Sequence, residues 1–324
     1  MVEIRIIQEG NVRMKQYYLF NIIQMKAPIF KLFLISSTFL ILTGCHKENS
    51  KENISEISGI NYYKQEDYRK ALPLLEKAAE TGSVEAALYL GDMYQYGKGV
   101  EQDFEISFKW YLKAAEKGDK ESSGMVGASY YLGRGVNQDY KESLKWLLKS
   151  AEKIDKKNPG ARDKKLLNLI MNMYLRGKGT LQDFSEAAKW AEKAAELGDA
   201  NSQAVMAFLL YTGQGVLADR KAARIWAQKS ADQGNDVGEV LMGVFNQYAD
   251  SPDMKAAFDW YEKSAKQGNP AAQYQLGTFY EEGIIVPEDI EKAHTYYKQA
   301  ADSKKSDNLV KALMDFEARQ KKQK

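Results

Sequence analysis

Large aromatic residues recur at almost constant intervals along most of this chain of 324 residues. Successive members of the series are separated by 36, 44, 36, 34 and 36 residues. The series consists of Trp110, Trp146, Trp190, Trp226, Trp260 and Tyr296. A period of this length is typical of a helix pair that cannot bury its apolar face alone, so neighbouring pairs must stack to form a continuous core. The spacing therefore predicts an all-α fold, an α/α superhelical solenoid, and argues against a compact enzyme core.

Glycines and helix-capping residues divide each repeat into two helices. In the first complete unit Ser83 follows Gly82, Gly97 and Gly99 interrupt the chain, and Asp103 precedes a second helical stretch. Glycine accepts the left-handed conformation at a helix end, and Ser, Asp or Asn then caps the next helix. First helices are also expected to begin after Asp119, Asp199, Asn235 and Asn269, and second helices after Asp139, Asp183, Asp219 and Asp253.

This punctuation predicts about six helix-turn-helix repeats between Ser83 and Asp302. A leading half-repeat, Asn61–Gly82, is expected to contain only a second helix. A closing C-terminal helix is expected from Asp307 to about Ala318, followed by a charged and frayed tail. In the second helix of each repeat, a pair of small residues follows the aromatic residue by four positions, as Ala114-Ala115 follows Trp110. Small residues allow helices to approach closely, so we expect the tryptophans to fill the gaps beside them.

The string Leu90-Gly91-x-x-Tyr94-x-x-Gly97-x-Gly99-Val100-x-x-Asp103, followed by Trp110-x-x-x-Ala114-Ala115-Glu116-x-Gly118, resembles the Sel1-like repeat (SLR). This repeat is a relative of the tetratricopeptide repeat with a longer loop. The resemblance covers residues 61–302 and implies a non-catalytic protein that holds a protein partner and needs no cofactor. Three local departures are visible: the fifth unit lacks the Gly-x-Gly turn, the sixth has Ile285 at the second glycine position, and eight extra residues fall around Asp155–Arg162.

The front of the chain carries a second signal. Residues 25–44 have a basic start and a short apolar run, as secretory signal peptides do. Residues 1–24 look like an over-extended start or an unusually long leader. Leu42-Thr43-Gly44-Cys45 resembles a bacterial lipobox, which implies that Cys45 is lipid-modified and becomes the mature N-terminus. The alternative is an uncleaved membrane anchor. Residues 45–60 are then expected to form a polar, lipid-anchored tether, and residues 303–324 the closing helix and charged tail.

The lipobox resemblance implies a location in the bacterial cell envelope. The protein would be anchored to the membrane through the lipid on Cys45. In enteric bacteria an aspartate after the lipidated cysteine retains a lipoprotein in the inner membrane, and His46 stands at that position here. For a Gram-negative organism the resemblance therefore implies the outer membrane, facing the periplasm or the cell surface.

The charge of the chain argues against a nucleic-acid partner. Residues 1–44 contain five of the 46 Lys and Arg residues and two of the 44 Asp and Glu residues, so the chain from Cys45 onward carries 41 basic and 42 acidic side chains. A near-neutral chain has no extended basic field to attract phosphates, and no motif for DNA or RNA binding is present.

The residues that carry most enzyme chemistry are scarce. The chain has one cysteine and two histidines, His46 and His294, so we expect neither a metal site nor a Cys–His nucleophile, and no catalytic residues. One alternative comes from the resemblance alone: some cysteine-rich relatives are described as hydrolases or binders of cell-wall fragments or β-lactams. A further alternative is a surface-displayed host-contact or virulence factor.

The first helices of such solenoids line a concave face, and periodicity places several apolar residues there. An apolar strip rimmed by charge is typical of a partner site. The alternative is that these residues pack against neighbouring helices and thicken the core. The candidate partner-binding residues are Tyr89, Tyr96, Met125, Arg176, Leu241 and Tyr248; Leu132 and Leu169 occupy the same strip. A second candidate surface is a basic row at the Gly-x-Gly turns, consisting of Lys98, Arg134 and Lys178, with Gln214 at the fourth turn; the alternative is a simply solvated edge.

Overall fold

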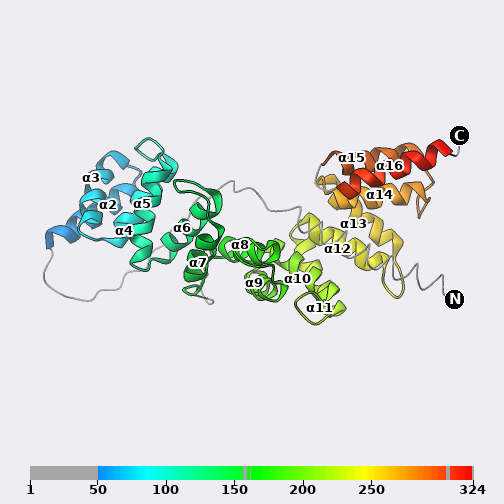
Figure 1. The fold of residues 1–324 in the computed structure, drawn as a ribbon, viewed down its shortest axis with the longest axis horizontal. Coiled ribbons are helices and arrows are strands. Elements are labelled where there is room, and N and C mark those ends of the chain that lie inside the picture. The colour runs from blue at the N-terminus through cyan, green and yellow to red at the C-terminus, as the bar shows by residue number, and fades with distance from the viewer. Residues whose placement is uncertain (1–49, 156–158, 161, 304–306, 323–324) are drawn as a thin grey trace. The chain divides into compact units, whose positions relative to one another are not determined.

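The computed structural model describes residues 50–155, 159–160, 162–303 and 307–322. These residues form fifteen α-helices and no β-strand (Figure 1). They divide into two compact units, residues 50–182 and residues 183–322. The all-α repeat fold predicted from the aromatic period is confirmed.

In the first unit each helix packs against the next along the chain. Its helices are α2 (Ser50–Lys64), α3 (Tyr68–Glu80), α4 (Val84–Tyr96), α5 (Phe104–Glu116), α6 (Lys120–Leu132), α7 (Tyr140–Ala151) and α8 (Asp163–Arg176). The second unit is built in the same way. It contains α9 (Phe184–Glu196), α10 (Ala200–Thr212), α11 (Arg220–Asp232), α12 (Asp236–Gln247), α13 (Met254–Lys266), α14 (Pro270–Glu281), α15 (Ile290–Asp302) and α16 (Asp307–Lys322).

The predicted caps begin and end these helices. The Ser83 hydroxyl accepts from the Ala86 amide at 3.0 Å, and the Asp103 carboxylate accepts from the Ile106 amide at 2.9 Å. Gly97 ends α4 in the left-handed conformation, with φ of 65°. Each bond satisfies a backbone group that has no partner inside the helix, which is why these positions recur with the repeat.

The second glycine of each turn has a further role. The turn after α6 lies against the start of α5, and a Cβ atom at Gly135 would stand 1.9 Å from the carbonyl oxygen of Phe104. A Cβ atom at Gly99 would stand 2.3 Å from the Cβ atom of Tyr68, the first residue of α3. Glycine is therefore needed here both for its positive φ and for the close approach of one repeat to the preceding one. Ile285 adopts the same left-handed conformation, with φ of 57°, although it has a β-branched side chain.

The core lies between the helices of each pair and its neighbours. Ala114 and Ala115 are fully buried, as their small size predicts. Tyr111 is also fully buried, and its ring lies over Gly91 of the preceding helix, where a Cβ atom would be only 2.4 Å from the ring. Gly243 and Tyr261 repeat this arrangement in the second unit. The largest buried aromatic residue in these repeats is thus the residue after the tryptophan.

The tryptophans themselves are only half-buried, so the expectation that they fill the inner gaps is wrong in part. Each is followed three residues later by a lysine whose ammonium group lies over the indole ring. The distance from Nζ to the ring centroid is 3.9 Å for Lys193 and Trp190, and 4.8 Å for Lys113 and Trp110. Residues three apart are neighbours on a helix surface, so the lysine covers the outer side of the ring.

The leading half-repeat is also a wrong prediction. Helix α2 packs on α3, so the array begins with a complete helix pair. Ile60 and Tyr63 of α2 are buried in that contact. The predicted tether is shortened accordingly, because residues 50–60 belong to α2. The rest of the predicted tether, the signal peptide and Cys45 lie outside the described residues.

The closing helix α16 is confirmed and runs to Lys322, beyond its predicted end at Ala318. Arg319 lies in the segment that was expected to fray. Its guanidinium group donates to the Glu281 carboxylate at 2.8 Å, so a bond to α14 extends the helix.

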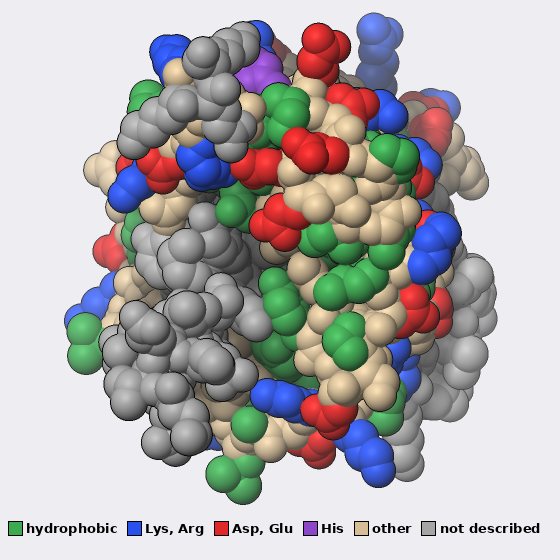
Figure 2. Space-filling view, turned by 90° about the vertical axis from the view of Figure 1, so that its right-hand side faces the viewer, with side chains coloured by type: hydrophobic (Ala, Val, Ile, Leu, Met, Phe, Trp, Pro, Cys, Tyr) green, Lys and Arg blue, Asp and Glu red, His purple; other side chains and the backbone are tan. Residues whose placement is uncertain are grey.

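Charges of both signs are mixed on the one face of the molecule that Figure 2 shows. On the face shown in Figure 2, Lys and Arg side chains alternate with Asp and Glu side chains and with apolar groups. No single-sign field covers that face, which agrees with the near-neutral composition of the chain.

Candidate protein-binding groove

Part of the predicted strip comes together in the first unit. Tyr96 of α4, Met125 and Leu132 of α6, and Leu169 of α8 line one pocket with a volume of about 150 Å³. Tyr96 is 38% exposed and Leu132 is 36% exposed, so the pocket is open to solvent. We call this pocket the α4–α8 groove. Leu166 and Leu147 complete its apolar lining.

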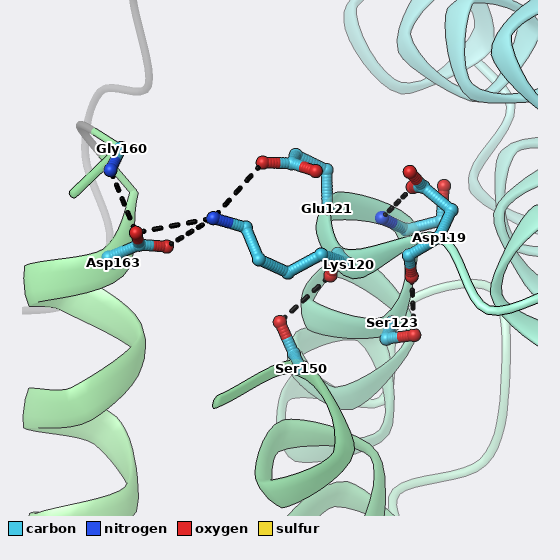
Figure 3. A network of polar contacts seen from close by, with 8 residues as sticks. Asp119, Lys120, Glu121, Ser123, Ser150, Gly160 and Asp163 are labelled. Atoms are coloured by element: carbon cyan, nitrogen blue, oxygen red, sulfur yellow. Dashed lines mark hydrogen bonds and ion pairs between the residues drawn. The ribbon is translucent and has the colours of Figure 1, made fainter. Parts of the chain in front are cut away.

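An ion pair joins α6 and α8, two of the helices that line the groove. Lys120, at the start of α6, extends toward Asp163 at the start of α8 (Figure 3). Its ammonium group lies 3.1 and 3.2 Å from the two carboxylate oxygens of Asp163. Asp163 also accepts from the Gly160 amide at 2.8 Å, and its side chain is only 5% exposed. The ion pair therefore joins α6 to α8 at one end of the groove.

Another buried acid lies beside the groove. The Asp92 carboxylate of α4 accepts from the Tyr111 hydroxyl at 2.6 Å. Its second oxygen is 4.0 Å from the Arg162 guanidinium, and its side chain is 14% exposed. Burial raises the pKa of the Asp92 carboxyl above its ordinary value, although Arg162 and Tyr111 act in the opposite direction. Arg162 also lines the groove, so this cluster contributes charge to its wall.

The remaining strip residues of the first unit lie outside the groove. Tyr89 is half-buried, and its ring packs on Tyr63 of α2 with centroids 4.6 Å apart. Arg176 is half-buried at the last turn of α8 and is not part of the lining. Sequence periodicity therefore placed Tyr96 and Met125 at one surface but could not separate them from Tyr89.

In the second unit the α12 part of the predicted partner-binding strip is covered by a neighbouring helix. Leu241 has no exposed surface, so the prediction that it contacts a partner is wrong. The physical reason is that α10 and α12 pack directly on each other, with the rings of Tyr211 and Phe245 5.0 Å apart. Every residue of α12 is buried as a result. Tyr248, just after α12, is half-buried, and burial raises the pKa of its hydroxyl.

The two lysines of the basic turn row, Lys98 and Lys178, form hydrogen bonds within the protein. The Lys98 ammonium group donates to the Tyr63 hydroxyl at 2.9 Å. Lys178 donates to the hydroxyls of Tyr131 and Tyr140 at 3.3 and 3.2 Å. These lysines hold one repeat to the aromatic residues of the preceding one, so the row is not an open basic edge.

The bond between Lys120 and Asp163 could not be predicted from the sequence pattern. The two residues are 43 positions apart and belong to different repeats, and the eight extra residues lie between them. The one available signal was the break in the aromatic period, which marks the connection before α8 as different from the others.

The described residues contain one histidine, His294, and many Asp and Glu side chains. No three His, Cys, Asp or Glu side chains among them are placed to hold a metal ion. His294 lies 3.0 Å from Glu317, in a partly exposed pair between α15 and α16. Among the helices that the structure describes, none has the length and apolarity of a membrane span.

A stack of helix pairs with an open groove defines the class of this protein, an α/α helical-repeat protein. The Sel1 repeat model matches most of the chain, over residues 58–83, 84–119, 123–155, 172–199, 200–235, 238–269 and 270–304. The chain belongs to the Sel1 repeat family. Proteins of this family are generally protein-interaction scaffolds and typically non-catalytic.

Two solved structures share the fold and are similar in sequence. A protective antigen of uropathogenic Escherichia coli with an SLR fold is 32% identical, with a TM-score of 0.65. The match covers 78% of this chain and 54% of that chain, so this chain spans about half the length of the antigen. A Sel1 repeat protein from Oxalobacter formigenes is 29% identical, with a TM-score of 0.61, over 76% of this chain and 96% of the other.

A shorter similarity links the chain to a eukaryotic protein. An ERAD-associated E3 ubiquitin-protein ligase component from Candida glabrata is 38% identical over 55 residues. That segment is 17% of this chain and 7% of the yeast protein. The likeness is therefore confined to a small part of that protein.

Proposed function

We propose that this protein is a non-catalytic scaffold that holds a protein partner in the α4–α8 groove. The observation that carries the proposal is the open apolar lining formed by Tyr96, Met125, Leu132 and Leu169. Apolar surface that is exposed and rimmed by charge costs free energy in a monomer and is favourable once a partner covers it. Membership of a family of interaction scaffolds supports the same function.

A groove variant tests this role. Met125→Ser combined with Leu169→Ser removes apolar lining from half-buried positions, so partner capture should fall while the helices remain folded. The matched control is Ile225→Ser, which changes a side chain 57% exposed on α11. Capture is measured by cross-linking in intact cells and mass spectrometry, and folding by circular dichroism. Equal capture by the folded groove variant and the control would show that the partner binds elsewhere.

We further propose that Cys45 carries a lipid that anchors the protein in the bacterial cell envelope, in the outer membrane. The support is the sequence of residues 25–45, with its basic start, apolar run and Leu42-Thr43-Gly44-Cys45 ending. Several acyl chains each bury many methylene groups at about 0.8 kcal/mol per group, which makes such attachment stable. Cys45→Ala should abolish labelling by radioactive palmitate. Equal labelling of the variant and the wild type would refute the anchor.

Display on the cell surface is a second candidate for the site of action. The similarity to the Escherichia coli protective antigen favours it, although the match spans only half of that protein. Trypsin added to intact cells should then degrade the protein, whereas a periplasmic protein would be degraded only after the outer membrane is opened.

A further inference from the structure

Helix α11 exposes different side chains from α7 and α9, the second helices of two preceding repeats. In α7 the Glu142 carboxylate pairs with Lys145 at 3.1 Å on the helix surface, and α9 has an equivalent pair. In α11 the same repeat positions hold Ala222 and Ile225. Ile225 is 57% exposed. An apolar side chain therefore stands at the surface of α11 where α7 and α9 have a balanced ion pair.

The surface around Ile225 is basic. Residues 200–231 contain one acidic residue, Asp219, which caps α11 by accepting from the Ala222 amide at 2.9 Å. The same range contains four basic residues, all exposed on α11: Arg220, Lys221, Arg224 and Lys229. Lys221 precedes Ile225 by four residues and Lys229 follows it by four, so the two lysines flank Ile225 on one side of the helix. We call Ile225 and the four basic residues the α11 face.

The basic groups of the α11 face contact uncharged groups. The Arg224 guanidinium donates to the amide oxygen of Asn246 at 2.7 Å. The other contacts are with a backbone carbonyl and two ring centroids: the Phe245 oxygen for Arg224 at 3.5 Å, the Tyr211 ring for Arg220 at 5.9 Å and the Trp226 ring for Lys229 at 4.3 Å. In the part of the chain that the structure describes, none of the four forms an ion pair with a carboxylate.

The acidic side chains near α11 do not cancel this charge. Asp232, in the last turn, accepts from the Gln228 amide at 2.7 Å. Asp236 and Glu239 of α12, the helix that packs on α11, are buried. Asp250, in the turn after α12, is exposed, but within the described residues it pairs with no cation of α11. With four basic residues and one acidic residue, α11 carries a net positive charge.

A second exposed apolar side chain precedes the helix. Leu217 lies in the turn that leads into α11 (Figure 1), and it is 92% exposed. A side chain with this exposure projects from the protein and forms no wall of a pocket. Leu181 is 87% exposed in the turn before α9, but α9 contains three glutamates and two lysines, so no positive charge accompanies that leucine. Helix α11 combines a projecting apolar side chain with a basic surface.

We propose that the α11 face and the turn that carries Leu217 dock on an anionic lipid surface. Leu217 and Ile225 enter the interface between the lipid headgroups and the acyl chains, and the basic residues of α11 meet the lipid phosphates. Basic side chains around exposed apolar ones are the pattern that binds such surfaces. An acidic soluble partner would need a pocket for the projecting Leu217, whereas a lipid interface deforms around it. The α11 face belongs to the second unit and the α4–α8 groove to the first, so this inference goes beyond the proposed function and does not rest on it.

A fluorescent label beside Leu217 tests the inference in the full chain. Ala218, which is exposed in the same turn, is changed to cysteine and labelled with an environment-sensitive dye. Cys45→Ala leaves this as the only cysteine, so the test does not depend on a lipid at Cys45. The chain is transferred from detergent into vesicles of phosphatidylcholine, with or without about 30% phosphatidylglycerol. A label at Asn137, exposed in the turn after α6, is the matched control.

We expect the emission of the Ala218 label to move to shorter wavelength in the anionic vesicles alone, and brominated acyl chains to quench it. The Asn137 label should show neither effect. Raising NaCl to about 0.5 M should reverse the response, because salt screens exposed charges.

Paired variants connect the response to α11. Lys221→Gln with Lys229→Gln should lower the ratio of docked to undocked chain at least about tenfold, because each basic residue near an anionic surface contributes separately. The matched control is Lys141→Gln with Lys149→Gln, at the same repeat positions on α7, and it should leave the response intact. Ile225→Ser should weaken docking without a loss of charge. Circular dichroism confirms that each variant is folded.

Three results would overturn the inference. These are equal emission of the Ala218 label in the two kinds of vesicle, equal effects of the α11 and α7 variants, or a response to a soluble polyglutamate peptide or a single-stranded oligonucleotide in place of the anionic vesicles. The proposed function fails separately. Met125→Ser with Leu169→Ser should lose partner capture and keep the vesicle response, whereas Ile225→Ser should keep partner capture and lose part of the vesicle response.

Discussion

Gly135→Ala should destabilise the first unit far more than a glycine-to-alanine change normally does. Two costs combine at this position. The backbone has φ of 69°, and a left-handed conformation costs a residue with a Cβ atom roughly 1–2 kcal/mol. In addition, the new Cβ would stand 1.9 Å from the Phe104 carbonyl oxygen, so the turn must move away from the start of α5. Overpacking of this kind adds about 1–3 kcal/mol, for a total of roughly 2–5 kcal/mol.

The same turn supplies a matched control. Gly133 has nearly the same φ, 67°, but a Cβ atom there would meet its nearest neighbour, Gln138 Cβ, at 3.3 Å. Gly133→Ala should therefore cost only the conformational part, roughly 1–2 kcal/mol. Urea unfolding followed by circular dichroism measures both changes, and neighbouring repeats can be expected to unfold with the weakened one. Equal losses for the two variants would refute the argument that the second glycine is needed for contact between repeats.

The other predictions concern packing, strain and pH. Trp190→Ala should cost about 2 kcal/mol, less than the 3–5 kcal/mol expected for the fully buried Tyr261→Ala, and urea midpoints distinguish the two. Ile285 is a β-branched residue in the left-handed conformation, and Ile285→Asn should stabilise the protein by about 1 kcal/mol because asparagine adopts this conformation with less strain. Ile285→Val keeps the β-branched side chain and should give no gain, and thermal melts measure both variants. Burial raises the pKa of the Asp92 carboxyl in the folded state, so the native state binds the carboxyl proton more tightly than the unfolded chain does. The free energy of unfolding should therefore fall as the pH rises from the ordinary Asp pKa toward the folded-state pKa. Asp92→Asn should remove that fall in urea unfolding measured over a pH series, and an unchanged pH dependence would refute the assignment.

The repeat fold could be predicted from the sequence because its signals are local. A glycine at a helix end and an Asp or Asn at the next helix start act within four residues, so they work in the same way in every repeat. The first helix pair was missed because α2 lacks the Gly-x-Gly turn after it. One signal was present: Gly59 precedes Tyr62 by three residues, as Gly91 precedes Tyr94. Gly59 also lies against Leu75, as Gly91 lies against Tyr111.

The candidate site was harder to predict because exposure depends on neighbouring repeats. Met125 and Leu241 occupy equivalent places in the period, yet Met125 lines a groove and Leu241 is fully buried. The difference arises from how closely successive first helices approach, and residues of another repeat set that distance. The tryptophans are half-buried for a similar reason. A glycine on the facing helix leaves room for the ring of the residue after the tryptophan, so that residue is buried and the tryptophan is not.

The groove also occurs where the repeat period is broken. The eight extra residues stand before α8, and α8 supplies one wall of the groove. In the second unit, where the steps on either side of Trp226 are 36 and 34 residues, α10 and α12 pack together and every residue of α12 is buried. Next to the insertion, α8 begins without a side-chain cap on its first turn, and Asp163 instead bonds to Gly160 and to Lys120 of α6. In this chain the break in the repeat period and the open groove therefore fall at the same connection, because the residues inserted before α8 change how the start of α8 meets α6.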